Sequence, residues 1–275
     1  MKRIFRIYPS YIAALLIALP AGFLTSFGAL VKHVLLLEGT GHFWTLPVEI
    51  KFYFALPALV WLLTHLRRRA WRLFVTGGLA LVAAVTFPYV AAEENSTDLR
   101  WYLSVFLFGV ITEEIYTLWE RKGRSWLCDA TCIAIALGAL LSIPYFRYLA
   151  FDIPPDRYLQ NKYLFFGVAW SAFLICASHS VRVMGFFQAN RFLRWIGGIS
   201  FPLYLVHYIV LAEVAPRITG LLPKAMVVVG LSLVISQIMH RLVEIPMIGV
   251  GRRLAKRLTT PAPARRENTP RVLTP

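Results

Sequence analysis

Long apolar runs, separated by short polar or basic stretches, dominate the pattern of this chain. A bilayer-spanning α-helix needs about 17–25 consecutive residues that are mostly apolar. Runs of this length recur along the chain, and from them we predict about eight transmembrane helices in an all-α, polytopic integral membrane protein. The predicted spans cover approximately residues 7–31, 43–64, 72–92, 101–119, 126–144, 161–178, 197–215 and 222–243.

The composition agrees with this pattern and excludes a nucleic-acid-binding protein. Of the 275 residues, 58% are hydrophobic and 16% are charged, whereas about a quarter of a soluble domain is charged. The net charge of +15 would suit a nucleic-acid partner if the cations lay together on a water-facing surface. They fall instead in short groups between the apolar runs, which is typical of membrane proteins.

The distribution of Lys and Arg predicts how the chain crosses the membrane. If the N-terminus is cytosolic, 21 of the 29 basic residues fall on the inner side, as the positive-inside rule requires. Both termini are then cytosolic. Residues 1–247 form one membrane domain, and residues 248–275 form a basic, Pro-rich cytosolic tail that we expect to be disordered and able to rest on anionic lipid.

The second predicted span carries two charges that lipid would not tolerate, Glu49 and Lys51. A charge near the centre of a membrane helix costs roughly 2.5–3.5 kcal/mol on insertion scales. Glu49 shares a helix face with Tyr53, four residues on. Either these groups lie near the outer interface, with Lys51 snorkelling, or they line a hydrated cavity walled by protein. We favour the cavity for Glu49, and for Lys51 both interpretations stand.

The seventh predicted span carries a polar stripe formed by Ser200, Tyr204 and His207. Their spacing of i, i+4 and i+7 places them on one face of an otherwise apolar helix. A buried histidine alone is usually a structural residue. Together with Ser and Tyr at bilayer depth, His207 favours a cavity wall.

Four further acids lie near the predicted inner ends of spans: Glu113, Glu114, Asp129 and Glu244. We expect the first three to snorkel or to pair with the basic loop at 121–124, and the last to pair with Arg241. Arg3 and Arg6 are three residues apart at the inner end of the first span. Two guanidinium groups on one face suit a polyphosphate or phosphoanhydride ligand, although the topology alone would also place cations there.

Five short segments stand out in order along the chain: "RIFRIYPSY" (3–11), "HFWTLPVEIKFYFALP" (42–57), "YLSVFLFGV" (102–110), "LRWIGGISFPLYLVHYIVL" (193–211) and "HRLVEIPM" (240–247). Each is weak alone. In this order and topology they resemble the motifs of acyltransferase family 3, polytopic membrane enzymes that O-acylate surface polysaccharides, lipids and other extracytoplasmic acceptors. The last segment is similar to the family's closing Glu-x-Pro motif.

The resemblance implies an acyltransferase with acyl-CoA, expected to be acetyl-CoA, as donor substrate. It implies no bound cofactor or metal, and an extracytoplasmic glycan or lipid as acceptor. Arg3 and Arg6 match the family's arginine pair, which is implicated in handling the donor, and Glu49 and His207 are the catalytic candidates. The residues expected to line the cavity are His42, Trp44, Tyr53, Ser200 and Tyr204.

The chain departs from the family pattern at its start. Members have ten spans, and the first carries a histidine, preceded by an arginine, that is thought to be the catalytic base. This chain resembles the family from the third span onward, so we expect either a fragment or a degenerate member with impaired chemistry. Phe201 replaces the usual Tyr, and Lys51 replaces an uncharged or acidic residue.

Two alternatives to an acyltransferase stay open at this point. The intramembrane Glu, Lys and His could form a substrate or proton path in a transporter or flippase for a glycan or lipid. A shortened member of the family could also be a non-catalytic membrane protein.

Overall fold

The computed structural model describes residues 2–93, 95–120, 123–143, 148 and 158–259, and these ranges are built from helices. The chain divides into two compact units. Unit 1 contains residues 1–30 and 198–275, and unit 2 contains residues 31–197.

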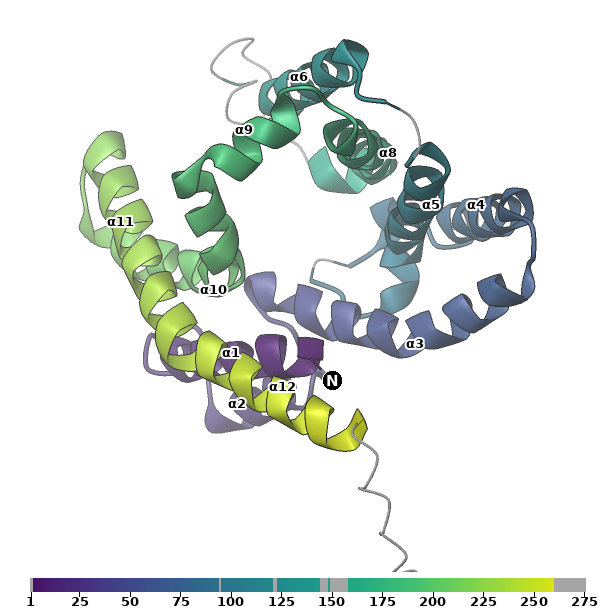
Figure 1. Cartoon of the computed structure of the whole chain (residues 1–275). Helices are drawn as coiled ribbons and strands as arrows, with labels where there is room; N and C mark the ends of the chain where they lie inside the picture. The colour runs from purple at the N-terminus through teal and green to yellow at the C-terminus, as the bar shows by residue number, and fades with distance from the viewer. Residues whose placement is uncertain (1, 94, 121–122, 144–147, 149–157, 260–275) are drawn as a thin grey trace, which may run out of the picture. The chain divides into compact units, whose positions relative to one another are not determined.

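Unit 1 is assembled from the two ends of the chain. Its N-terminal helix packs against the C-terminal helix and against the π-helical turn before it, so residues more than 230 positions apart become neighbours. The elements are α1 (Lys2–Ala18), α2 (Phe27–Val34, which continues into unit 2), α10 (Arg191–Val214, which begins in unit 2), η4 (Ala215–Arg217), α11 (Leu221–Met239), η5 (His240–Glu244) and α12 (Ile245–Thr259) (Figure 1).

In unit 2, α5 packs against both α4 and α8, and α6 packs against α8 (Figure 1). A buried cluster of Ala80, Ala83 and Leu107 joins α4 to α5, because small side chains let two membrane helices approach closely. The elements are η1 (Gly41–Trp44), α3 (Thr45–His65), α4 (Arg69–Thr86), η2 (Tyr89–Ala91), η3 (Leu99–Tyr102), α5 (Leu103–Trp119), α6 (Trp126–Leu141), α8 (Tyr158–Ser178) and α9 (Val183–Ala189).

Four helical stretches of the described residues are long and apolar enough to cross a membrane: Gly41–His65, Arg69–Thr86, Arg191–Arg217 and Leu221–Lys256. They correspond to the second, third, seventh and eighth predicted spans. The apolar helices at Trp126–Leu141 and Tyr163–Ser178 are shorter. The chain is therefore a multi-pass membrane protein, while the total of eight spans stays a prediction.

The first predicted span, residues 7–31, is not one continuous helix. Helix α1 ends at Ala18, and α2 begins at Phe27. Pro20 has no N–H group to extend the helix, and Gly22 has a φ of 72°, in the left-handed region that glycine adopts without strain. These residues turn the chain before α2.

Helix α12 extends to Thr259 and so includes the first part of the region predicted as a tail from residue 248. Apolar and basic residues alternate here with a helical period, and α12 packs against α1. Gly251 allows the contact, since a Cβ atom at this position would lie 2.7 Å from the Cβ of Phe5. Residues 260–275 of the predicted tail lie outside the described residues.

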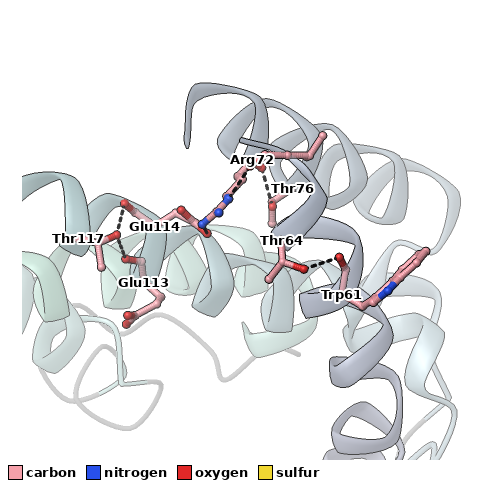
Figure 2. A network of polar contacts seen from close by, with 8 residues as sticks. Trp61, Thr64, Arg72, Thr76, Glu113, Glu114 and Thr117 are labelled. Atoms are coloured by element: carbon pink, nitrogen blue, oxygen red, sulfur yellow. Dashed lines mark hydrogen bonds and ion pairs between the residues drawn. The ribbon is translucent and has the colours of Figure 1, made fainter. Parts of the chain in front are cut away.

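Two of the acids of unit 2 that were predicted to lie at inner ends, Glu114 and Asp129, have partners other than the basic loop at 121–124. Glu114 pairs with Arg72 of α4 at 3.6 Å, and Arg72 also donates through Nε to the carbonyl of Leu66 (Figure 2). Asp129 is 5% exposed, and its carboxylate accepts the backbone N–H groups of residues 181–183 at 2.9–3.1 Å. Asp129 thus joins α6 to the first turn of α9 instead of snorkelling.

We predict that Asp129→Asn lowers the thermal unfolding midpoint of the protein in detergent. An amide has one acceptor oxygen and no charge, whereas the carboxylate accepts three charge-assisted hydrogen bonds, each roughly twice as strong as a neutral one. The matched control is Asp98→Asn, which removes the charge from an exposed cap paired with Arg100; an exposed pair contributes only about 0–1 kcal/mol. Equal shifts for both variants would contradict the role assigned to Asp129.

Candidate active site

The N-terminal end of α3 carries the first group of predicted site residues. Trp44 ends η1, and α3 begins at Thr45. Pro47 lies in the first turn of the helix, where a backbone N–H would have no intrahelical partner, so proline costs no hydrogen bond there. Pro47 is buried. The local sequence therefore starts the helix directly after Trp44 and leaves Glu49 one turn inside.

A loop before η1 supports Trp44. His33 is fully buried, and its Nε2 accepts a hydrogen bond from the N–H of Thr40 at 2.8 Å. Gly39 packs directly on the backbone of Trp44, because a Cβ atom built at Gly39 would lie 2.3 Å from the Trp44 Cα. Only glycine fits that approach, so the loop and the tryptophan are positioned together.

Trp44 forms part of an aromatic cavity within unit 2. Its ring stacks on Tyr102 with centroids 4.6 Å apart and planes 21° apart. The cavity has a volume of about 520 Å³, in the range typical of small-molecule sites, and eight of its lining residues are aromatic. The described residues that line it are Trp44, Thr45, Val48, Glu49, Tyr89, Tyr102, Val105, Phe106, Phe108, Gly109, Tyr163, Phe166, Gly167, Trp170, Ser171 and Leu174.

Glu49 is the one charged residue among the described residues of this lining. It is half-buried, and its carboxylate accepts a hydrogen bond from the hydroxyl of Tyr53, one turn along the same helix. The hydroxyl of Tyr163 is buried in the lining and has no hydrogen-bond partner among the described residues. The sequence predicted a hydrated chamber at Glu49. A cavity is there, but its wall is mostly apolar, and eight of the sixteen described lining residues are aromatic.

The side chain of Lys51 contacts the loop between η2 and η3. Its Nζ donates to the carbonyl oxygen of Thr97 at 2.7 Å, next to Asp98 and Arg100. The side-chain hydrogen bond from Arg100 is the main influence that lowers the pKa of the Asp98 carboxyl. Lys51 therefore ties α3 to this loop, and it is not among the described residues that line the cavity.

The stripe on α10 belongs mainly to unit 1. Ser200 is exposed, and Tyr204 and His207 are half-buried. The Nδ1 of His207 lies 2.8 Å from the carbonyl oxygen of Tyr204. With the proton on Nδ1 to make this bond, a neutral imidazole carries its lone pair on Nε2, as a general base requires. Ser200, Tyr204 and His207 thus lie in a different unit from the Glu49 cavity.

The other predicted cavity residues do not contribute to the wall. His42 lies in η1 with its ring against Phe43, centroids 4.3 Å apart. Tyr53 contacts the carboxylate of Glu49. Neither is among the described residues that line the cavity.

The arginine pair lies on α1, where Arg3 and Arg6 share one face. The Nε of Arg6 donates to Oε1 of Glu244 at 2.6 Å, and the Nδ1 of His240 contacts Oε2 of the same carboxylate at 2.7 Å. Glu244 is fully buried. The sequence suggested Arg241 as its partner; the observed partners are an arginine at the other end of the chain and a histidine one turn earlier.

Sequence reasoning missed most of the cavity wall. Tyr89, Tyr102, Tyr163 and Trp170 all contribute to it, but aromatic residues are common throughout apolar spans and carry no spacing that marks a cavity. Buried His33 was missed for the same reason: a histidine in a short apolar helix gives no signal of the loop that it holds.

A family model described as an acyltransferase domain matches residues 1–241. The chain belongs to acyltransferase family 3. No solved structure matches it.

Two curated relatives agree with this family. The chain is 26% identical over 219 residues to the peptidoglycan O-acetyltransferase OatA of Listeria monocytogenes. The aligned region covers 74% of the chain and 34% of the relative. It is 24% identical over 225 residues to the O-acetyltransferase OatA of Staphylococcus aureus strain NCTC 8325, covering 77% of the chain and 36% of the relative. The chain thus spans about a third of the length of these relatives.

We predict that Gly39→Ala displaces Trp44 and destabilises unit 2, because a methyl group would meet backbone atoms that cannot rotate away. Overpacking of this kind costs about 1–3 kcal/mol. The matched control is Gly77→Ala in α4, where a Cβ would meet no atom within 4 Å. Thermal unfolding in detergent measures both, and an unfolding midpoint unchanged in the Gly39 variant would refute the packing argument.

Proposed function

We propose that this chain is a membrane-bound O-acyltransferase that moves an acetyl group from cytosolic acetyl-CoA to a hydroxyl of an extracytoplasmic glycan or lipid. The observation that carries the proposal is the family match over residues 1–241, together with relatives named as O-acetyltransferases, one of them as a peptidoglycan O-acetyltransferase. The cavity at Glu49 supplies a place for the chemistry.

Glu49 is suited to act on the acceptor. A carboxylate in an aromatic, mostly apolar wall has few competing water molecules, which strengthens its hydrogen bonds with a substrate hydroxyl. The hydroxyl of Tyr53 donates to the carboxylate and holds its orientation. The aromatic rings can contact the apolar faces of a sugar ring or a lipid, and the cavity of about 520 Å³ exceeds the size of an acetyl group.

In the proposed reaction the acceptor oxygen attacks the thioester carbonyl. A C–O ester bond forms, the C–S bond breaks, and CoA leaves as the thiol. The proton of the acceptor hydroxyl passes to a base and from the base to the departing sulfur. General-base assistance of this kind contributes about 10²–10⁴-fold. Glu49 is one candidate base, and Nε2 of His207 is the other.

Arg3 and Arg6 are proposed to bind the phosphates of the donor. Guanidinium groups match phosphate oxygens through paired N–H donors, and helix α1 places both arginines at the end of the chain that the positive-inside rule assigns to the cytosol. The Ser200 and Tyr204 side chains of α10 are proposed to line the route of the acyl group.

A transporter or flippase is the competing function. It would move a glycan or lipid across the membrane without forming an ester. Covalent modification therefore separates the two functions, since substrate flux with no new ester would favour transport.

We predict that deleting the gene for this chain removes a base-labile acetyl ester from an extracytoplasmic glycan or lipid of its host. Restoring the wild-type gene restores the ester. Glu49→Gln, which keeps the shape of the side chain and removes its charge, should reduce acetylation about 10²-fold or more if Glu49 is the base. Mass spectrometry of the isolated glycan and lipid fractions measures the ester, and immunoblotting of membranes checks that the variant is present.

Glu93→Gln is the matched control, because Glu93 is an exposed acid of the outer loop away from the cavity lining. It should leave acetylation unchanged. Wild-type acetylation in the Glu49 variant would exclude Glu49 as the base, and identical ester content in the deleted and restored strains would refute the enzymatic function.

A further inference from the structure

Glu244 is a fully buried acid that the proposed chemistry does not use. Such a charge is strongly destabilising unless the protein pairs it. The apolar ends of α11 and α12 could have enclosed a neutral side chain at this position. The buried position of Glu244 and its two partners therefore indicate a functional role for this residue.

The sequence around Glu244 explains how its side chain is placed. Residues His240–Glu244 form a π-helical turn, and the N–H of Ile245 bonds to the carbonyl of His240, five residues back. Pro246 has no N–H group for the α-helical bond to Leu242, and its ring would clash with that carbonyl. The wider turn avoids the clash, and π-turns of this kind occur frequently at functional sites.

Both oxygens of the Glu244 carboxylate are engaged from different directions. Oε1 accepts from Nε of Arg6 at 2.6 Å, and Oε2 lies 2.7 Å from Nδ1 of His240. The histidine comes from the same turn, so it holds the carboxylate in one orientation. The arginine comes from α1, and its conformation is set by the carboxylate.

The hydrogen bond to Glu244 uses Nε of the Arg6 guanidinium. Its two terminal nitrogens are not needed for this bond, and 47% of the Arg6 side chain is exposed. A long arginine side chain normally samples many rotamers, and ordering it on binding opposes affinity. The bond to Glu244 already orders the Arg6 side chain. A phosphate would therefore bind a guanidinium group that is held in position before the ligand arrives.

The helix pair that carries Arg6 is rich in basic residues. Helix α12 packs on α1 with Gly251 against Phe5, and the exposed Arg252 and Arg253 follow directly. Glu244 neutralises a single charge of this group. The α1–α12 pair therefore suits a ligand with several phosphate charges, as acyl-CoA has.

We propose that Glu244, held by His240, is a positioning residue that orients Arg6 to bind the phosphates of the acyl-CoA donor. This inference rests on the proposed function, because it assumes acyl-CoA as donor. Glu244 itself touches no substrate in this scheme and acts through the guanidinium of Arg6.

Whether Glu244→Gln weakens or tightens the binding of acetyl-CoA distinguishes a positioning role from simple charge neutralisation. The experiment measures the Kd of acetyl-CoA for the full chain in nanodiscs of zwitterionic lipid, so that no anionic headgroup competes. If Glu244 positions Arg6, Glu244→Gln weakens binding about tenfold or more, the loss expected for a misplaced hydrogen bond to a charged group. If Glu244 only neutralises charge, the same variant makes the site more positive and binds acetyl-CoA more tightly.

Glu213→Gln is the matched control. Glu213 of α10 also pairs with an arginine of unit 1, Arg217 of η4, at 2.9 Å, but this pair is exposed. The Kd of acetyl-CoA for the Glu213→Gln variant should equal that for the wild type. A similar loss of affinity in both variants would overturn the specific role of Glu244.

A double-mutant cycle tests whether Glu244 acts through Arg6. In an Arg6→Ala background, Glu244→Gln should cause no further loss of affinity, because the group that it orients has been removed. The same loss in both backgrounds would mean general structural damage and would refute the inference. If the Glu244 variant does not fold, His240→Ala replaces it in both backgrounds and is judged by the same criteria, with a smaller loss expected.

The outcomes distinguish this inference from the proposed function. If the wild-type protein binds no acetyl-CoA, the assumed donor is wrong. Both the proposed function and the inference about Glu244 then fail. Wild-type binding that Glu244→Gln leaves unchanged or tightens overturns the positioning role alone and leaves the donor assignment intact.

Discussion

A bilayer offers no hydrogen-bond partner to a charged side chain, so a charge kept in a membrane helix must find its partner within the protein. This constraint organises both units of the chain. Glu49 accepts from Tyr53 at a cavity, Asp129 accepts three backbone N–H groups, and Glu244 is shared by Arg6 and His240. Each acid either joins distant segments or faces a space where a ligand can enter.

The three acids satisfy this constraint in different ways, and the difference separates structure from chemistry. The carboxylate of Asp129 is saturated by backbone donors, so it fastens α6 to α9 and has little capacity for a substrate. The carboxylate of Glu49 has a tyrosine on one side and an aromatic cavity on the other. Glu244 lies between these cases: it is saturated, but one of its partners remains partly exposed.

Proline and glycine decide the local geometry at both candidate sites. Pro47 lies in the first turn of α3 and Gly39 allows the preceding loop to reach Trp44, which together place Glu49 beside the aromatic rings. Pro246 is incompatible with a regular helix at residue 242, and the resulting π-turn carries Glu244. In both places, residues without a chemical role set the backbone conformation, and this conformation determines the position of the charged side chain, Glu49 or Glu244.

The sequence by itself determined the helical membrane class, the family and the candidate site residues, because the length of apolar runs and the spacing of rare polar residues are local properties. It also indicated that Glu49 and Tyr53 share a face. Only the tertiary structure decided which groups meet: Arg6 with Glu244, Lys51 with Thr97, and the rings of Tyr89, Tyr102, Tyr163 and Trp170 around one cavity. Those contacts join segments far apart in the chain, and the packing of helices, which no single apolar run encodes, brings them together.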